Sequence, residues 1–206
     1  MKAGKWIVKI ILAGFICGFQ SGIYAADSKW SVGASVGASE TDLSNLSIDN
    51  SFGADGFSTT TTFSDTESSW NVFVGYKYSI NLGLEVGYTS FGEFGYSGTK
   101  TGPAGTYTGT REITGFYGAI VGYFPLSETL SLMGKFGMAS WDEDGSISNA
   151  SMQNSAFVRG DSSSDLLIGA GIEYKITDSI SFRGDLMQLK APENIHMWSA
   201  GLIYNF

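Results

Sequence analysis

The sequence predicts an all-β fold, an eight-stranded antiparallel transmembrane β-barrel with short periplasmic turns and long extracellular loops. Apolar residues alternate with small or polar ones over about eight segments of roughly ten residues, enough to cross a bilayer when tilted. Long and short connections alternate between these segments, as in bacterial outer-membrane barrels. The composition is rich in Gly and aromatic residues and has only 3 Pro, which favours many short strands over helices.

The N-terminal 25 residues have the pattern of a secretory signal peptide. Three lysines, the last being Lys9, precede or flank an apolar run over residues 10–19, about half the roughly 20 residues that a spanning helix needs. We expect cleavage between Ala25 and Ala26, which leaves residues 26–206 as the barrel domain. An uncleaved anchor helix is the alternative, and Lys9 disfavours it by interrupting any longer apolar span.

Charge and cysteine content restrict the chemistry of the exported chain. Cys17 is the only cysteine and lies inside the signal, so neither a disulfide nor thiol chemistry is expected after cleavage. Loss of three signal lysines and no carboxylate lowers the formal net charge from −8 to −11. Such an acidic chain is not expected to bind nucleic acid.

Taken in order, the strands are expected at about 29–39, 70–78, 82–89, 112–124, 130–141, 166–175, 179–189 and 195–206. Short turns follow the second, fourth and sixth of these strands. Residues 40–69, 91–111 and 142–163 have the Gly-, Ser- and Thr-rich composition of long loops, and 190–194 is a shorter one. An even number of strands places both ends of the barrel in the periplasm.

Parity along each strand predicts which side chains face lipid and which face the lumen. In the fourth strand, parity predicts that these residues face lipid: Ile113, Gly115, Tyr117, Ala119, Val121 and Tyr123. In the other strands it turns inward a set of charged residues, namely Glu85, Lys135, Glu173, Arg183 and Asp185, with Lys77 as a further candidate.

The last strand ends in the order polar, Gly, aromatic, aromatic, at Ser199, Gly201, Tyr204 and Phe206. This order resembles the C-terminal signal that delivers bacterial barrels to their assembly machinery. The same residues place Trp198, Ala200, Leu202 and Tyr204 on one face of the strand, as expected for a lipid-facing surface.

Two stretches resemble the OmpA-like eight-stranded outer-membrane barrel family, residues 78–88 (YSINLGLEVGY) and residues 169–174 (GAGIEY) followed by 180–183 (ISFR). The resemblance implies a lumen network of two acids and two bases at Glu85, Lys135, Glu173 and Arg183. Strand parity turns the same side chains inward, and burial of unpaired charge in a narrow barrel would be costly. Shear and tilt decide which charges pair, so the pairs are left open.

The inward charges allow two interpretations. They are a structural plug, since eight strands enclose a lumen that side chains can fill. Alternatively they form a gate, in which the basic side chains exchange carboxylate partners and open a narrow ion path.

Three other features are candidate sites. Aromatic residues near strand ends are typical of interfacial girdles, although a carbohydrate surface would use the same types. His196 and Ser199 are three residues apart and so on opposite faces of a strand, which disfavours lipid deacylation of the PagL kind. Asp142, Glu143 and Asp144 could hold a divalent cation shared with lipopolysaccharide phosphates, although a solvated acidic loop is the simpler interpretation.

These observations favour a non-enzymatic, monomeric outer-membrane barrel without cofactor or metal, whose loops carry a structural or surface-interaction role. Outer-membrane lipid, lipopolysaccharide, periplasmic chaperones, the barrel-assembly machinery and a host or cell-surface ligand are the expected partners. An adhesin or host-defence protein of the OmpX and Ail type, and a narrow ion channel, are the alternatives.

Overall fold

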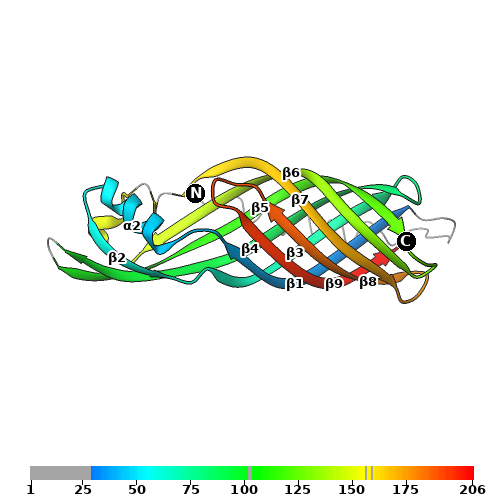
Figure 1. Cartoon of the computed structure of the whole chain (residues 1–206), viewed down its shortest axis with the longest axis horizontal. Helices are drawn as coiled ribbons and strands as arrows, with labels where there is room; N and C mark the ends of the chain where they lie inside the picture. The colour runs from blue at the N-terminus through cyan, green and yellow to red at the C-terminus, as the bar shows by residue number, and fades with distance from the viewer. Residues whose placement is uncertain (1–28, 102–103, 156, 159) are drawn as a thin grey trace, which may run out of the picture.

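The computed structural model describes residues 29–101, 104–155, 157–158 and 160–206 as a long, closed barrel (Figure 1). The predicted signal peptide and its cleavage site at Ala25 and Ala26 lie outside the described residues. Nine strands form one sheet: β1 (Trp30–Thr41), β2 (Ser58–Phe63), β3 (Thr66–Lys77), β4 (Leu82–Thr101), β5 (Gly105–Pro125), β6 (Leu130–Ile147), β7 (Ser162–Lys175), β8 (Ile180–Leu189) and β9 (Ile195–Asn205). The helices are α2 (Asn45–Ala54) and the 3₁₀ turn η1 (Ala150–Met152).

Eight of these strands close the barrel and one extends it. The order around the barrel is β1, β3, β4, β5, β6, β7, β8, β9, with β9 paired back to β1 and every pairing antiparallel. Strand β2 lies at the edge of the sheet and pairs with the outer half of β4. The predicted eight-stranded antiparallel barrel is therefore confirmed. Among the described residues, no helix is long and apolar enough to span a membrane.

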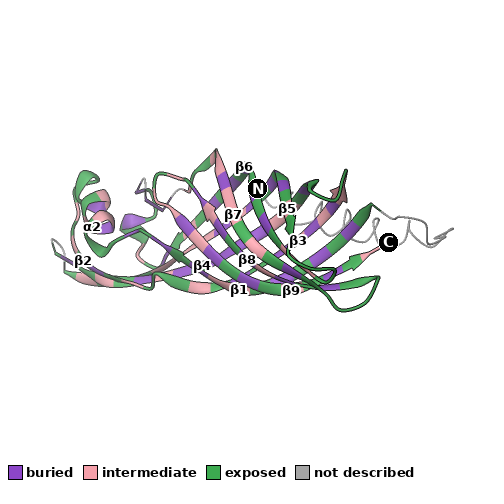
Figure 2. Ribbon diagram, turned by 45° about the vertical axis from the view of Figure 1, so that its right-hand side comes forward, coloured by how far each residue is buried: buried purple, intermediate pink, exposed green. Residues whose placement is uncertain are grey.

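The two faces of the barrel wall alternate residue by residue, as Figure 2 shows in the stripes of buried and exposed residues. Apolar side chains such as Val36 (71% exposed), Val86 (60%) and Leu186 (62%) point outward. These values describe a surface that a membrane must cover, because a water-soluble protein rarely exposes so large an apolar area.

Outward-facing aromatic rings lie at the two edges of this apolar band. Trp30 and Tyr76 have ring centroids 4.8 Å apart near the short turns. At the other edge, Tyr88 lies 5.7 Å from Trp70 and 4.8 Å from Phe116. This arrangement matches interfacial girdles.

In strand β5 the predicted assignment of inward and outward faces is wrong. Tyr117 (4% exposed) and Val121 (0%) face the lumen, whereas Phe116 (54%) and Ile120 (53%) face outward. Both faces of this strand are apolar, so its sequence does not distinguish them. Pairing with β4 decides the matter, because it places Tyr117 beside the inward-facing Glu85.

The expected loops at 40–69, 91–111 and 142–163 are largely folded, which is a second correction. Strand β4 continues to Thr101 and stays paired with β5, which begins at Gly105, and β6 continues to Ile147. The first loop contains α2 and β2. The register of pairing between β4 and β5 shifts by one residue of β4 between Ser90 and Gly92, and Gly92 has a φ of 109°. This bulge moves the inward side chains of β4 from odd to even positions, which hides the alternation.

Candidate functional site

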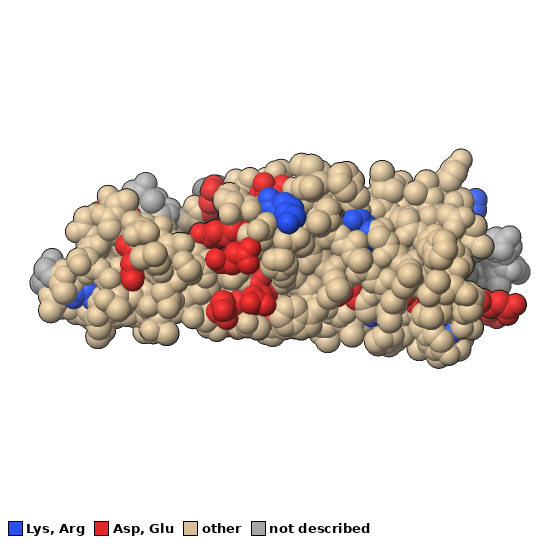
Figure 3. Space-filling model, in the orientation of Figure 1, with Lys and Arg blue, Asp and Glu red and all other residues tan. Residues whose placement is uncertain are grey.

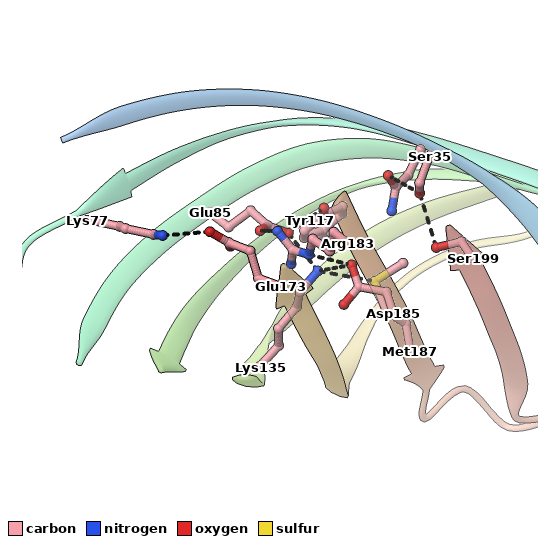
Figure 4. Close-up of polar contacts among 11 residues, drawn as sticks. Ser35, Lys77, Glu85, Tyr117, Lys135, Glu173, Arg183, Asp185, Met187 and Ser199 are labelled. Atoms are coloured by element: carbon pink, nitrogen blue, oxygen red, sulfur yellow. Dashed lines mark hydrogen bonds and ion pairs between the residues drawn. The ribbon is translucent and has the colours of Figure 1, made fainter. Parts of the chain in front are cut away.

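Four of the predicted inward charges meet in the middle of the barrel (Figure 4). Lys135 Nζ lies 2.8 Å from Glu85 Oε1 and 3.1 Å from Asp185 Oδ2. The Arg183 guanidinium contacts the same two acids, with Nη1 2.7 Å from Glu85 Oε2 and Nε 2.7 Å from Asp185 Oδ2. We call Glu85, Lys135, Arg183 and Asp185 the lumen quartet. Its two acids and two bases carry no net charge.

The quartet is removed from water on all sides. Its side chains are 0 to 3% exposed. The Tyr117 hydroxyl donates a third hydrogen bond to Glu85, at 2.7 Å. The Phe73 ring covers the cluster, with its centroid 4.5 Å from Arg183 Cζ and 5.7 Å from Lys135 Nζ. Buried charges of this kind are tolerated because each has opposite charges and hydrogen-bond partners nearby.

Two glycines make the room that these aromatic rings occupy. Gly33 lies opposite Phe73 in the sheet, and a Cβ there would be 2.2 Å from the ring. Gly87 lies opposite Tyr117, where a Cβ would be 2.7 Å from three ring atoms. The small residues of the lumen face therefore allow the rings to lie across it.

Glu173 is inward but does not join the quartet. Its Oε1 accepts a hydrogen bond of 2.8 Å from Lys77, whose side chain is 38% exposed. The Lys77 ammonium also lies 4.6 Å from the centroid of the Tyr123 ring. The five predicted residues and Lys77, the further candidate, thus divide into a dry quartet and a more exposed pair, Lys77 and Glu173, nearer the short turns. Strand parity did not reveal Tyr117 and Phe73 as partners of the quartet, because it assigned Tyr117 to the outer face.

Above the quartet most of the large buried side chains of the lumen are apolar, although smaller polar ones such as Asn71 and Thr89 lie among them. Buried side chains from most of the strands pack there in one cluster, including Phe91, Phe94, Ile113, Trp141, Leu167, Leu189, Ile195 and Met197. The barrel interior is consequently filled along its length by a charged layer and an apolar layer, as expected for eight strands.

The part beyond the membrane band has a hydrophobic core of its own. Ile48 and Phe52 of α2 are fully buried, and Phe52 packs edge-on against Tyr107 (5.5 Å) and Phe157 (5.2 Å). The helix begins at Ser44, whose hydroxyl accepts the amide of Ser47 at 3.2 Å. We call residues 42–66, the outer parts of β4 to β6 and the described residues among 148–161 (148–155, 157–158 and 160–161) the extracellular extension. Its buried rings make it a folded structure.

The acidic run at 142–144 lies on β6 and alternates between its faces. Glu143 is buried and binds Arg111 through both carboxylate oxygens, whereas Asp142 and Asp144 point outward. The three carboxylates therefore do not converge on one cation, and the expected solvated loop is a strand. Figure 3 shows many acidic side chains gathered at the base of the extension.

His196 and Ser199 lie on opposite sides of the barrel wall, as strand parity predicts. His196 Nε2 faces outward, 3.8 Å from Asp42 Oδ1 and 3.4 Å from the Gln188 amide. Ser199 faces the lumen, where its Oγ accepts a hydrogen bond of 3.0 Å from Ser35. The imidazole has no path to the serine hydroxyl, so this arrangement cannot generate a nucleophile.

The four residues of the expected assembly signal divide between the two faces of β9 and its end. Tyr204 faces outward and its ring lies 5.1 Å from that of Phe206, while Ser199 faces inward. A Cβ at Gly201 would be 2.1 Å from the backbone oxygen of Ala34, so this position admits only glycine without rearrangement. Their role in assembly stays a prediction.

Comparisons with known proteins agree with this architecture. The family model described as the OmpA-like transmembrane domain matches residues 25–206. Among solved structures, the chain resembles OprG of Pseudomonas aeruginosa (TM-score 0.56, 13% identity, 87% of this chain and 97% of that one). It also resembles Neisserial surface protein A (0.53, 12%, 87% and 98%) and Ail of Yersinia pestis (0.50, 15%, 86% and 99%). No curated protein matches the sequence.

Proposed function

The chain belongs to the OmpA-like transmembrane domain family and is a barrel of the bacterial outer membrane, and from this we propose that it is a plugged scaffold presenting a folded surface for interaction. One observation carries the proposal. The extracellular extension has a hydrophobic core, centred on Phe52 and Tyr107, that is distinct from the apolar cluster in the lumen. An ordered surface loses less conformational entropy on binding than a flexible loop does.

The contents of the lumen favour a structural scaffold over an ion-conducting channel. The quartet is dry, neutral and covered by Phe73 and Tyr117, and the apolar layer lies above it. An ion would have to lose much of its hydration to pass the large apolar side chains of this layer. We therefore propose a monomeric, non-enzymatic barrel whose inward charges act as a structural plug.

The surface role is tested by removing the helix-bearing segment without opening the barrel. The Thr41 amide donates to the Asp65 carbonyl at 3.0 Å, so the two ends of the segment are already adjacent. Replacing residues 43–63 by an Asn-Gly turn should leave a barrel that migrates faster on unboiled gels, as folded barrels do. Cells carrying it should lose attachment to host cells and matrix. Unchanged attachment would reject a role for this segment in adhesion or host defence.

A narrow channel is the second candidate, and one observation favours it. Lys135 and Arg183 each contact both acids of the quartet, and Arg183 Nη2 and Asp185 Oδ1 form no hydrogen bond with the described residues. The ion pairs could therefore exchange partners. Steady single-channel steps in planar bilayers, altered in both Glu85→Ala and Arg183→Ala, would support the gate. Silence from demonstrably folded protein would support the plug.

A further inference from the structure

A cavity lies at the extracellular mouth of the barrel, between the apolar lumen layer and the extension. Its volume is about 200 Å³. Phe94, Ile113, Trp141 and Ile195 come from four different barrel strands, and Leu43 and Phe63 come from the first extracellular segment. Residues 191–193, in the connection between β8 and β9, also line it. We call this space the mouth cavity.

The walls of the mouth cavity suit an aromatic or short aliphatic group. The rings of Phe63 and Phe94 stack with centroids 6.1 Å apart and an interplanar angle of 26°. The Trp141 indole is held in place by a hydrogen bond of 2.7 Å from its Nε1 to Asp165. An apolar cavity of about 150 Å³ can hold benzene, so the mouth cavity can hold one ring with a short chain.

The charge around the cavity is unbalanced. Among the described lining residues, only Arg111 is basic, whereas Glu143, Asp161 and Glu193 are acidic. Arg111 is committed to Glu143 by two hydrogen bonds and reaches Glu193 only at 3.5 Å. Burial raises the pKa of the Glu193 carboxyl, as does the nearby Glu143, while Arg111 opposes them. Glu193 therefore carries a partly buried negative charge that is incompletely compensated.

We propose that the mouth cavity binds a small organic cation, with an apolar ring or chain between Phe63, Phe94 and Trp141 and an ammonium group against Glu193. Net negative charge at the rim favours a cation, and an anion would meet Glu143, Asp161 and Glu193. Aromatic walls add cation–π attraction for an ammonium group. This small-molecule site goes beyond the proposed surface role, which depends on the outer face of the extension.

The test is calorimetric titration of the barrel, refolded in detergent micelles, with 2-phenylethylamine at neutral pH. The same titration with 2-phenylethanol and 3-phenylpropionate varies the charge at nearly constant size, and protein-free micelles give the background partitioning. We expect saturable binding of the amine, with the alcohol and the acid at least about tenfold weaker, the loss expected for one charge-assisted hydrogen bond. Equal affinity for the amine and alcohol, or no saturable binding, would overturn the proposal.

Variants locate the site. Glu193→Gln should weaken amine binding about tenfold. The matched control is Glu128→Gln, which makes the same change at an exposed glutamate in the turn between β5 and β6. It should leave the affinity unchanged. Ala191→Phe places a ring in the mouth cavity and should abolish binding of both amine and alcohol. Full binding by the folded Glu193→Gln or Ala191→Phe protein would reject the site.

Discussion

Replacing Glu85 by alanine is expected to destabilise the barrel by about 3–5 kcal/mol. Glu85 accepts from Lys135, Arg183 and Tyr117 at 2.7 to 2.8 Å, and its side chain is 2% exposed. Without it, two buried cations share Asp185 alone, and the quartet changes from neutral to a net charge of +1. Each ion pair that Glu85 forms is worth roughly 5 kcal/mol of Coulomb attraction at an effective dielectric constant of about 20. Relief of the desolvation cost of the carboxylate offsets much of this attraction.

The matched control is Glu173→Ala, which removes the same side chain from the same lumen. Its partner Lys77 is 38% exposed and can be solvated after the change, so the expected destabilisation is about 1 kcal/mol or less. Free energies of unfolding would be measured by urea titration in lipid vesicles, followed by tryptophan fluorescence and the gel shift of folded barrels. If Glu85→Ala were no more destabilising than Glu173→Ala, the buried ion pairs of the quartet would not be what stabilises the barrel.

Three further outcomes are expected. Gly33→Ala should lower the free energy of unfolding by about 1–3 kcal/mol in the same urea titration, because the added Cβ meets the Phe73 ring. Gly122→Ala should be neutral, because no atom lies within 4 Å of the added carbon. Equal effects of the two changes would contradict this steric explanation. Phe52→Ala should remove about 3–5 kcal/mol from the extension, so that protease cleaves residues 43–66 faster while the gel shift persists; unchanged proteolysis would show that α2 is held otherwise. Burial raises the pKa of Tyr96 to about 12, so the stability that this protonated phenol provides should be complete below pH 10 and decline between about pH 10 and 12; Tyr96→Phe should remove a step near pH 12 from the ultraviolet titration, and loss of a step near pH 10 instead would contradict the shift.

The sequence was sufficient to predict the barrel and its inward charges because a lipid-facing surface admits few polar groups. Glu85, Lys135, Arg183 and Asp185 lie on strands whose opposite face is apolar, so parity alone orients them. Strand β5 has large apolar residues on both faces, and there parity gave the wrong answer. The composition of the quartet also needed the structure, because strand stagger brings Asp185 to Lys135 and leaves Glu173 with Lys77.

The extracellular extension was not predictable for a different reason. The bulge at Gly92 shifts the alternation within β4, so the outer half of that strand has no continuous pattern with the inner half. Helix α2 contains several Ser and Asn residues, which have low helix propensity, and tertiary packing of Ile48 and Phe52 stabilises it. Arg111 and Glu143 are 32 residues apart, and only the pairing of β5 with β6 brings them together.

The β4–β5 hairpin determines how far the protein reaches from the cell. From Gly92 to Thr101 the strand runs about 30 Å at roughly 3.3 Å per residue, and a tilt of about 40° leaves a height of about 23 Å. That height is comparable to the thickness of the apolar band itself. A large partner can therefore touch α2 and the outer ends of β4 and β5 without approaching the lipid headgroups, whereas the mouth cavity lies closer to the membrane, where the extension meets the lumen.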